Sequence, residues 1–227
     1  MFMLEVIATC LEDVKRIEKA GGNRIELIAA YTEGGLTPSY ALIKAAVEAV
    51  NIPIHVMIRP HAKSFIYTQE EIELMKEDIQ IAQSLGVAGV VLGVLTEENK
   101  IDEEKLADLL SVVDGVNVTF HRAIDEVEDL VGAVEILRKF DKVTHILTSG
   151  GTGYIVENIP VLAEMKKASE EEIELIIGSG VTRENIEKLL HDTGIKQVHV
   201  GTAAREGKSC FAEIDQNAIR SLLNVIV

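Results

Sequence analysis

Positive charge is scarce in this sequence of 227 residues. It carries 22 Lys and Arg against 37 Asp and Glu, so its formal net charge at pH 7 is −15. Nucleic acids and anionic membranes are recognised through basic patches, and we therefore expect neither as a partner. No apolar run is long enough to cross a bilayer, and the N-terminus lacks the basic and apolar regions of a signal peptide. These absences predict a cytoplasmic protein.

Cysteines and recognisable metal motifs are also scarce. The two cysteines, Cys10 and Cys210, lie far apart and form no Cys-x-x-Cys pair, which gives no sign of a disulfide framework and fits a reducing compartment. No His-Glu-x-x-His motif and no clustered acidic loop is present, so no zinc or calcium site is recognisable. Met57 and His55 could donate to a metal, but scattered residues of these types more often belong to the core or rim. The sequence leaves the identity of any metal open.

The sequence does contain a regular alternation of strand-like and helix-like segments, with a period of about 28 residues for eight units. Strands are expected at 4–8, 24–28, 54–59, 89–94, 118–120, 142–147, 173–177 and 197–200. Helices are expected at 11–20, 40–50, 68–85, 102–113, 126–139, 156–167, 182–191 and 215–223. Eight such units predict a single-domain (β/α)8 (TIM) barrel over residues 1–227. A doubly wound open sheet is the less favoured alternative, because no Gly-x-Gly-x-x-Gly follows the first strand.

The fifth expected strand leads into three polar residues, His121, Arg122 and Asp125. Polar side chains are costly to bury at the end of a core strand for packing alone, and the carboxyl ends of barrel strands are where ligands bind. We therefore interpret these three as site residues, with His121 and Asp125 as catalytic candidates. The alternative is a structural network in which Asp125 satisfies the other two.

Polar residues also interrupt other strands, although barrel strands are buried on both faces and should be apolar throughout. The period-2 alternation of side chains predicts a cluster at the C-terminal mouth of the barrel, made of Glu5, Glu26, Arg59 and His121. Such a set offers carboxylates for acid–base catalysis or metal binding and an arginine for an anion. The alternative is a buried ion-pair network in which either glutamate pairs with Arg24 or Arg59.

Glycine-rich loops follow the last three expected strands. Ser149 begins a Ser-Gly-Gly segment after the sixth strand, Gly178 and Gly180 follow the seventh, and Gly201 follows the eighth. In TIM barrels this corner often binds phosphate through backbone N–H groups. These four residues are therefore candidates for anion binding, unless the glycines only make tight turns between strand and helix.

Several sequence blocks occur together in a characteristic order. They are Arg-Ile-Glu-Leu (24–27), Gly-Gly-Leu-Thr-Pro-Ser (34–39), Met-Ile-Arg-Pro (57–60), Thr-Phe-His-Arg-Ala (119–123) with Asp125, and Leu-Thr-Ser-Gly-Gly (147–151). Extended by Gly178, Gly180 and His199, they resemble the signature blocks of the CutC copper homeostasis family over nearly the whole chain. The resemblance implies a TIM barrel, a cytoplasmic location and a role in copper binding or trafficking, with no settled reaction. It also adds His199 to Arg59 and Arg122 as a candidate substrate- or anion-binding residue.

Two departures from the family pattern bear on copper. The family usually carries a cysteine two residues after the glutamate of the first strand and another directly after Ile-Glu-Leu in the second. These positions are Ile7 and Ile28 here. Thiolate is the ligand that Cu(I) prefers, so copper binding through these two positions does not carry over from the resemblance. Cys10 lies nearby, in the following loop, and the usually basic, glycine-rich segment after Pro60 is reduced to residues 61–64.

Two functions remain open from the sequence. The first is a copper homeostasis protein that binds the metal without performing chemistry. The second is a TIM-barrel enzyme acting on a small phosphorylated or carboxylated metabolite, in which Arg59 holds the anion and His121 is the general acid–base. Glu5 or Glu26 would then be the second proton-transfer group or a metal ligand. In both cases the partner is a small molecule or a metal ion, and a homo-oligomer is compatible with either.

Overall fold

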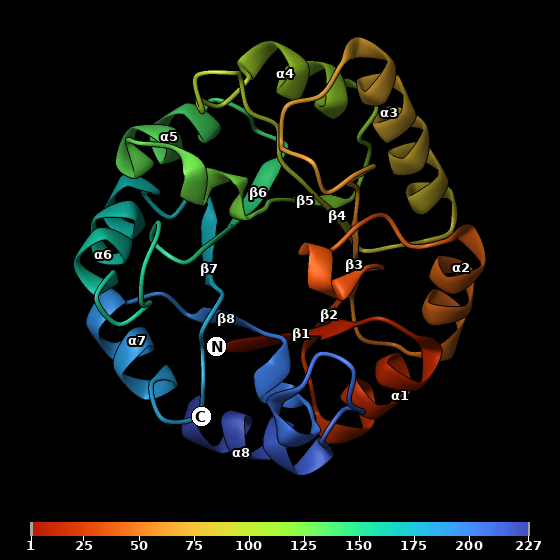
Figure 1. The fold of residues 1–227 in the computed structure, drawn as a ribbon, viewed down its shortest axis with the longest axis vertical. Coiled ribbons are helices and arrows are strands. Elements are labelled where there is room, and N and C mark those ends of the chain that lie inside the picture. The colour runs from red at the N-terminus through yellow and green to blue at the C-terminus, as the bar shows by residue number, and fades with distance from the viewer. Residues whose placement is uncertain (1, 227) are drawn as a thin grey trace.

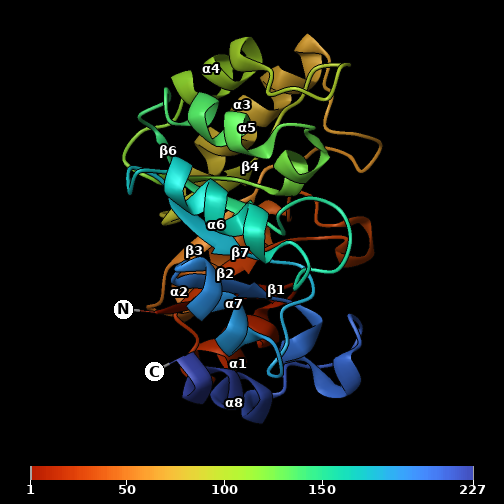
Figure 2. The same cartoon turned by 90° about the vertical axis from the view of Figure 1, so that its left-hand side faces the viewer.

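In the computed structural model, which describes residues 2–226, eight parallel strands close into a barrel surrounded by eight helices (Figure 1). Each strand pairs with the next one along the chain, and the last strand pairs with the first. This closed ring confirms the predicted single-domain TIM barrel and rules out the open sheet. Figure 2 shows both termini on one side of the barrel and the long loops that follow several strands on the opposite side.

Every expected strand and helix is present. The strands are β1 (Met3–Ala8), β2 (Arg24–Leu27), β3 (Ile54–Met57), β4 (Gly89–Leu92), β5 (Asn117–Phe120), β6 (Val143–Thr148), β7 (Glu174–Ile177) and β8 (Gln197–Val200). The α-helices are α1 (Leu11–Ala20), α2 (Tyr40–Ala49), α3 (Gln69–Ser84), α4 (Glu103–Ser111), α5 (Leu130–Leu137), α6 (Ile159–Ala168), α7 (Ile186–Thr193) and α8 (Gln216–Ile226). Short 3-10 turns are η1 (Tyr31–Glu33), η2 (Arg122–Glu126), η3 (Thr202–Ala204) and η4 (Glu206–Lys208).

The predicted starts of two helices were wrong, because local turns come first. After β5 the chain forms η2 and becomes extended at Val127, and Asp129 then caps α5 by accepting a backbone N–H three residues on at 2.9 Å. Before α7, the backbone N–H of Thr182 donates to the Asn185 side chain at 2.8 Å. Thr182 is therefore part of a preceding turn and is not the cap of the helix.

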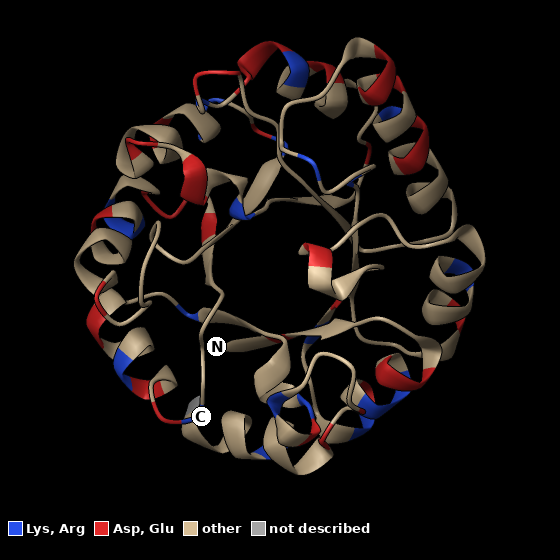
Figure 3. Cartoon of the chain, in the orientation of Figure 1, with Lys and Arg blue, Asp and Glu red and all other residues tan. Residues whose placement is uncertain are grey.

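The helices bury apolar residues against the strands, and Figure 3 shows that many of the charged residues lie on the surrounding helices. In α1, for example, Val14 and Ile17 are fully buried while the first and last turns carry charged residues. The predicted capping box opens α3: the Thr68 hydroxyl accepts from the Glu71 N–H at 3.2 Å, and the Glu71 carboxylate accepts from the Thr68 N–H at 2.8 Å. Within residues 2–226 no helix combines the length and apolarity needed to cross a membrane.

A polar layer crosses the barrel interior below its mouth. Arg24 donates from Nε to the Glu5 carboxylate at 2.5 Å and from Nη2 to the Gln197 side chain at 3.0 Å. Arg24 and Glu5 are neighbours because β1 and β2 pair in that register. The ring of His55 is buried in the same interior, and Gly89 leaves room for it, since a Cβ there would lie 2.6 Å from the ring. This layer lies between the candidate site and the N-terminal end of the barrel.

Candidate functional site

A pocket of about 450 Å³ opens at the C-terminal ends of the barrel strands. Seven of the residues predicted from the sequence line it: Glu26, Arg59, His121, Arg122, Gly180, His199 and Gly201. Glu5, Asp125, Ser149 and Gly178 are not among the described residues of its lining. The pocket therefore brings most of the predicted site together, and the remaining residues lie behind its wall.

A carboxylate–histidine–carboxylate row lies at the base of the pocket. His199 on β8 hydrogen-bonds through Nδ1 to Oε1 of Glu5 on β1 at 2.7 Å. Its other ring nitrogen, Nε2, lies 3.8 Å from Oε2 of Glu26 on β2. The second oxygen of Glu26, Oε1, is buried and makes no hydrogen bond to any residue between 2 and 226. Buried polar atoms are almost always paired in folded proteins, so this oxygen is a candidate contact for a ligand.

The three members of this row differ in charge. Burial raises the pKa of Glu26 to about 7, with the Glu5 carboxylate adding to the rise. Burial opposes ionisation of Glu5 as well, but the Arg24 guanidinium and the hydrogen bond with His199 hold the pKa of Glu5 well below its usual range. Burial alone would lower the pKa of His199, yet the two glutamates outweigh it and raise that pKa. At neutral pH the row combines an ionised Glu5, a histidine biased toward its protonated form and a Glu26 that titrates.

Arg59 lines the same pocket and lies two residues after the end of β3, directly before Pro60. Its Nη1 donates to the backbone oxygens of Glu33 at 2.9 Å and Gly35 at 3.2 Å. The guanidinium lies over the Phe65 ring, 4.6 Å from the ring centroid. These contacts hold the side chain in place. They supply no negative charge to balance the guanidinium.

The alternative in which Arg59 pairs permanently with Glu5 or Glu26 is wrong. Arg59 is 6% exposed, and it forms no ion pair with a carboxylate in the described part of the chain. Its Nε is buried without a hydrogen-bond partner among those residues. Arg24 is the arginine that pairs with Glu5. Glu5 therefore belongs to a buried structural ion pair, and the charge of Arg59 remains available to a ligand.

His121 is neutral at physiological pH. Its Nδ1 accepts the backbone N–H of Ala123 at 3.2 Å, so the ring proton must lie on Nε2. Burial, aided by the nearby Arg59 charge, lowers the pKa of His121 to about 3. The ring packs against Phe65 with centroids 4.9 Å apart, and Gly93 makes room for it, since a Cβ there would lie 2.5 Å from Nδ1. His121 can donate a hydrogen bond to a ligand but carries no charge.

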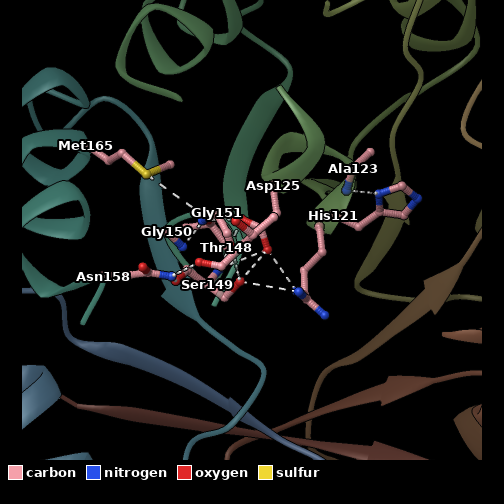
Figure 4. Close-up of polar contacts among 11 residues, drawn as sticks. His121, Ala123, Asp125, Thr148, Ser149, Gly150, Gly151, Asn158 and Met165 are labelled. Carbon is pink, nitrogen blue, oxygen red and sulfur yellow. Dashed lines mark hydrogen bonds and ion pairs between the residues drawn. The ribbon is translucent and has the colours of Figure 1, made fainter. Parts of the chain in front are cut away.

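Asp125 organises the loop after β6, as Figure 4 shows. It accepts from the Thr148 hydroxyl at 2.6 Å, the Ser149 hydroxyl at 2.7 Å and the Ser149 and Gly151 backbone N–H groups at 3.1 and 3.3 Å. It also accepts a hydrogen bond from Nε of Arg122 at 2.8 Å. Asp125 pairs with Arg122, as the structural alternative expects, but among the described residues it makes no hydrogen bond to His121, and Ser149 belongs to the same network. Arg122 is the member that reaches the pocket.

The glycine corner differs from a simple phosphate cradle. A Cβ on Gly178 would lie 2.6 Å from Leu147, so this glycine allows close packing behind the wall. Gly201 lies against the Tyr31 hydroxyl, which would be 1.8 Å from a Cβ at that position. Gly180 has φ +82° and lines the pocket. Gly180 and Gly201 therefore reach the pocket together with Arg59, whereas Gly178 does not belong to its described lining.

Tyr31 is a pocket residue that the sequence analysis missed. It begins η1, which in Figure 1 lies over the barrel mouth. The segment folds back because Ala29 and Leu36 exchange two backbone hydrogen bonds of 2.9 Å, with Ala30 at φ +48°. Burial raises the pKa of the Tyr31 phenol to about 12, so it stays protonated. No strand or helix periodicity covers this segment, and only its folded path reveals that the side chain reaches β8.

Among residues 2–226, one group of side chains could hold a metal ion, and it lies at the base of the pocket. Ligand atoms of Glu5, Glu26 and His199 lie within 4.8 Å of one another. Both oxygens of Glu5 already accept hydrogen bonds, so it would orient a ligating His199 rather than bind the ion itself. Nitrogen and oxygen donors fit a divalent ion, whereas Cu(I) prefers sulfur. Ile7 and Ile28 line the pocket and offer no ligand atom, so the Met57 thioether is the only sulfur donor in the described lining and no thiolate is present for Cu(I).

Comparison with known proteins identifies the family to which this chain is similar. The CutC family model matches residues 2–204. A CutC family protein of Pasteurella multocida is 38% identical over 197 residues, which is 87% of this chain and 80% of that protein. The human copper homeostasis protein cutC homolog is 36% identical over 198 residues, covering 87% of this chain and 72% of the relative.

Solved structures give the same result. The crystal structure of a protein named CutC from Streptococcus agalactiae has a TM-score of 0.83 and 36% identity, and the match covers 88% of this chain and 98% of that chain. Phosphoribosyl anthranilate isomerase from Thermococcus kodakaraensis has a TM-score of 0.65 at 16% identity, with 100% and 99% coverage, which shows a shared barrel fold alone. The chain belongs to the CutC family.

Proposed function

We propose that this CutC-family chain is a cytoplasmic enzyme acting on a small phosphorylated or carboxylated metabolite. The observation that carries the proposal is the buried, unpartnered Oε1 of Glu26, which lies in a pocket beside His199. A carboxyl group with a pKa near 7 is suited to proton transfer at physiological pH. The acidic composition argues for a small molecule as the partner, with neither nucleic acid nor a membrane, and a homo-oligomer is compatible with this role.

In this proposal Glu26 is the general base and His199 is the general acid. Glu5 fixes the ring of His199 through Nδ1, and this leaves Nε2 directed to the pocket side of the row. His121, which the sequence favoured for acid–base work, would instead donate a hydrogen bond, because its pKa of about 3 keeps it neutral. A substrate proton would pass to Glu26, and a leaving or re-protonated atom would take a proton from His199.

Replacing Glu26 by glutamine is expected to reduce turnover by about a hundredfold or more, because the general base is lost while the shape of the side chain is kept. The measurement is consumption of phosphorylated and carboxylated metabolites, followed by mass spectrometry of a defined metabolite mixture. In the parent protein kcat/KM should fall about tenfold per pH unit below pH 7, since protonation of Glu26 removes the base. The acid limb should disappear from the residual activity of Glu26→Gln.

Glu33→Gln is the matched control for this experiment. Glu33 also lines the pocket, but its side chain is exposed and lies at the rim. We expect Glu33→Gln to retain parental turnover and its acid limb. Parental activity in Glu26→Gln, or an unchanged pH profile, would remove Glu26 from the mechanism.

Copper binding is the second candidate, and the donor group at the base of the pocket is the observation that favours it. The names of the human and Streptococcus relatives connect those proteins with copper or with CutC. In this chain Glu26 and His199 would hold a divalent copper ion as cargo, with Glu5 hydrogen-bonded to the ligating histidine. The same two side chains serve both candidates, so binding assays must accompany activity assays.

Cu(I) is expected to bind weakly compared with relatives that carry both family cysteines. Ile7 and Ile28 supply no thiolate, and Cys10, which is exposed at the start of α1, supplies at most one. A competition titration against a Cu(I) chelator measures this affinity. The matched control restores the donors in Ile7→Cys/Ile28→Cys, which should bind Cu(I) more tightly. Stoichiometric Cu(I) binding that survives Cys10→Ala in the parent sequence would show that other residues form the ligand set.

A further inference from the structure

We infer that the anionic group of the substrate is a tetrahedral oxyanion, a phosphoryl or sulfuryl group, that docks on Arg59, His121 and Arg122 at the β3–β5 side of the pocket. This inference rests on the proposed function and specifies which of its two substrate classes the pocket takes. It places the anion away from the loops after β7 and β8, where TIM barrels commonly hold phosphate.

The first argument is the uncompensated charge of Arg59. Burying a guanidinium without a counter-charge is costly, and a buried arginine is normally paired with a carboxylate. The other buried arginines follow this rule, since Arg24 pairs with Glu5 and Arg205 pairs with Asp13 at 2.7 Å. Arg59 departs from it within the described chain and keeps an unpartnered Nε in a residue that lines the pocket. An anion bound there would supply the missing counter-charge.

Two further donors line the pocket, the neutral ring of His121 and the charged side chain of Arg122. His121 presents an Nε2–H that is buried and unpartnered among residues 2–226, because Nδ1 is already used as an acceptor. Arg122 is held by Asp125 at Nε and by Ser149 at Nη2, at 2.8 and 3.3 Å. The third guanidinium nitrogen of Arg122, Nη1, donates no hydrogen bond to any described residue. Because these two hydrogen bonds already hold Arg122, less side-chain entropy is lost when it binds a ligand.

Three donors from three separate side chains favour a tetrahedral group over a planar carboxylate. A carboxylate offers two oxygens in one plane, which one guanidinium can take in a fork. Here each arginine has its fork partly occupied by protein acceptors, so each is left to donate to a different oxygen. The β8 corner is less suited to this role, because the Tyr31 hydroxyl lies against Gly201. The reacting end of the substrate would then face Glu26 and His199.

The test is anion binding by the full chain, measured by thermal shift and by isothermal titration calorimetry. Inorganic phosphate and sulfate are the probes, and acetate at equal ionic strength is the planar comparison. We expect phosphate and sulfate to raise Tm well above the effect of acetate. Arg59→Met, Arg122→Gln and His121→Phe should each weaken phosphate binding, by about tenfold or more for the two arginines. Lys208→Ala, at the β8 side of the same pocket, should bind as the parent does.

The variants also separate this inference from the proposed function. Glu26→Gln should lose turnover but bind phosphate normally, because Glu26 does not contact the anion. Sulfate also stabilises folded proteins in general, and this effect on Tm should persist in Arg59→Met and Arg122→Gln. Stabilisation through specific binding at the site should be lost in both variants. The Arg122 side chain is 45% exposed, so Arg122→Gln should fold even if Arg59→Met does not. Phosphate binding that equals acetate binding in the parent, or that is lost in Lys208→Ala but kept in Arg122→Gln, would overturn the inference.

Discussion

Replacing Arg24 by methionine is expected to lower the free energy of unfolding by roughly 3–5 kcal/mol. The Arg24–Glu5 pair is almost completely buried, with 3% and 2% of the side chains exposed. Removing the guanidinium leaves the Glu5 carboxylate in the barrel interior with only the His199 ring as a polar partner. The Gln197 side chain also loses the Arg24 donor. Urea unfolding followed by circular dichroism measures the loss.

Two controls make this result specific. Arg24→Met combined with Glu5→Gln removes both charges and should recover much of the loss, since no isolated buried charge remains. Lys188→Met breaks an ion pair with Asp192 on the surface of α7, where 58% of the lysine side chain is exposed. Such pairs contribute roughly 0.2–1 kcal/mol. A loss below about 1 kcal/mol in Arg24→Met would show that Glu5 finds another partner or takes up a proton.

Asp125→Ala is expected to cost roughly 2–4 kcal/mol of stability, because several buried donors lose a charged acceptor together. The Thr148 hydroxyl and the Ser149 backbone N–H are the most buried of these donors. The same change frees Arg122, so phosphate binding should weaken in parallel with stability. Thermal unfolding and phosphate titration of one preparation measure both effects.

Asp129→Ala is the matched control for Asp125→Ala. Asp129 is exposed in the same region and caps α5 through a single backbone N–H. Loss of such a cap typically costs about 1 kcal/mol and should leave phosphate binding unchanged. Equal losses from the two substitutions would mean that the loop after β6 does not depend on Asp125.

The sequence was sufficient to predict the barrel and seven of the residues that line the pocket, because strand periodicity and sequence blocks are visible in the chain itself. Strand alternation places Glu26 on an inward-facing position, whereas His199 follows from the family resemblance, and polar residues in apolar strands are visible without a structure. The partner of Glu5 could not be predicted, because Arg24 and Arg59 are both plausible until the register of β1 and β2 is known. Register depends on how the whole barrel closes, which no local pattern encodes.

Tyr31 and Asp125 show a second limit of the sequence. Tyr31 reaches Gly201 across 170 positions of the chain, and its path depends on a loop that folds back on itself. Asp125 looks like a catalytic carboxylate in the sequence, yet its oxygens are taken up by the Thr148–Gly151 loop. Hydrogen bonds of this kind depend on loop conformation, and loops carry no periodic signal.

The isoleucines at positions 7 and 28 also change how the pocket responds to oxidants and alkylating reagents. Sites built on cysteine are inactivated when their thiols are oxidised or alkylated. The lining that the structure describes contains no thiol, and Met57 is its sulfur-containing residue. Cys10 is exposed and lies outside that lining. Thiol-directed labels would react at Cys10 and at the partly exposed Cys210, which lies near Tyr31 but outside the described lining, and peroxide stress has no thiol to modify in that lining.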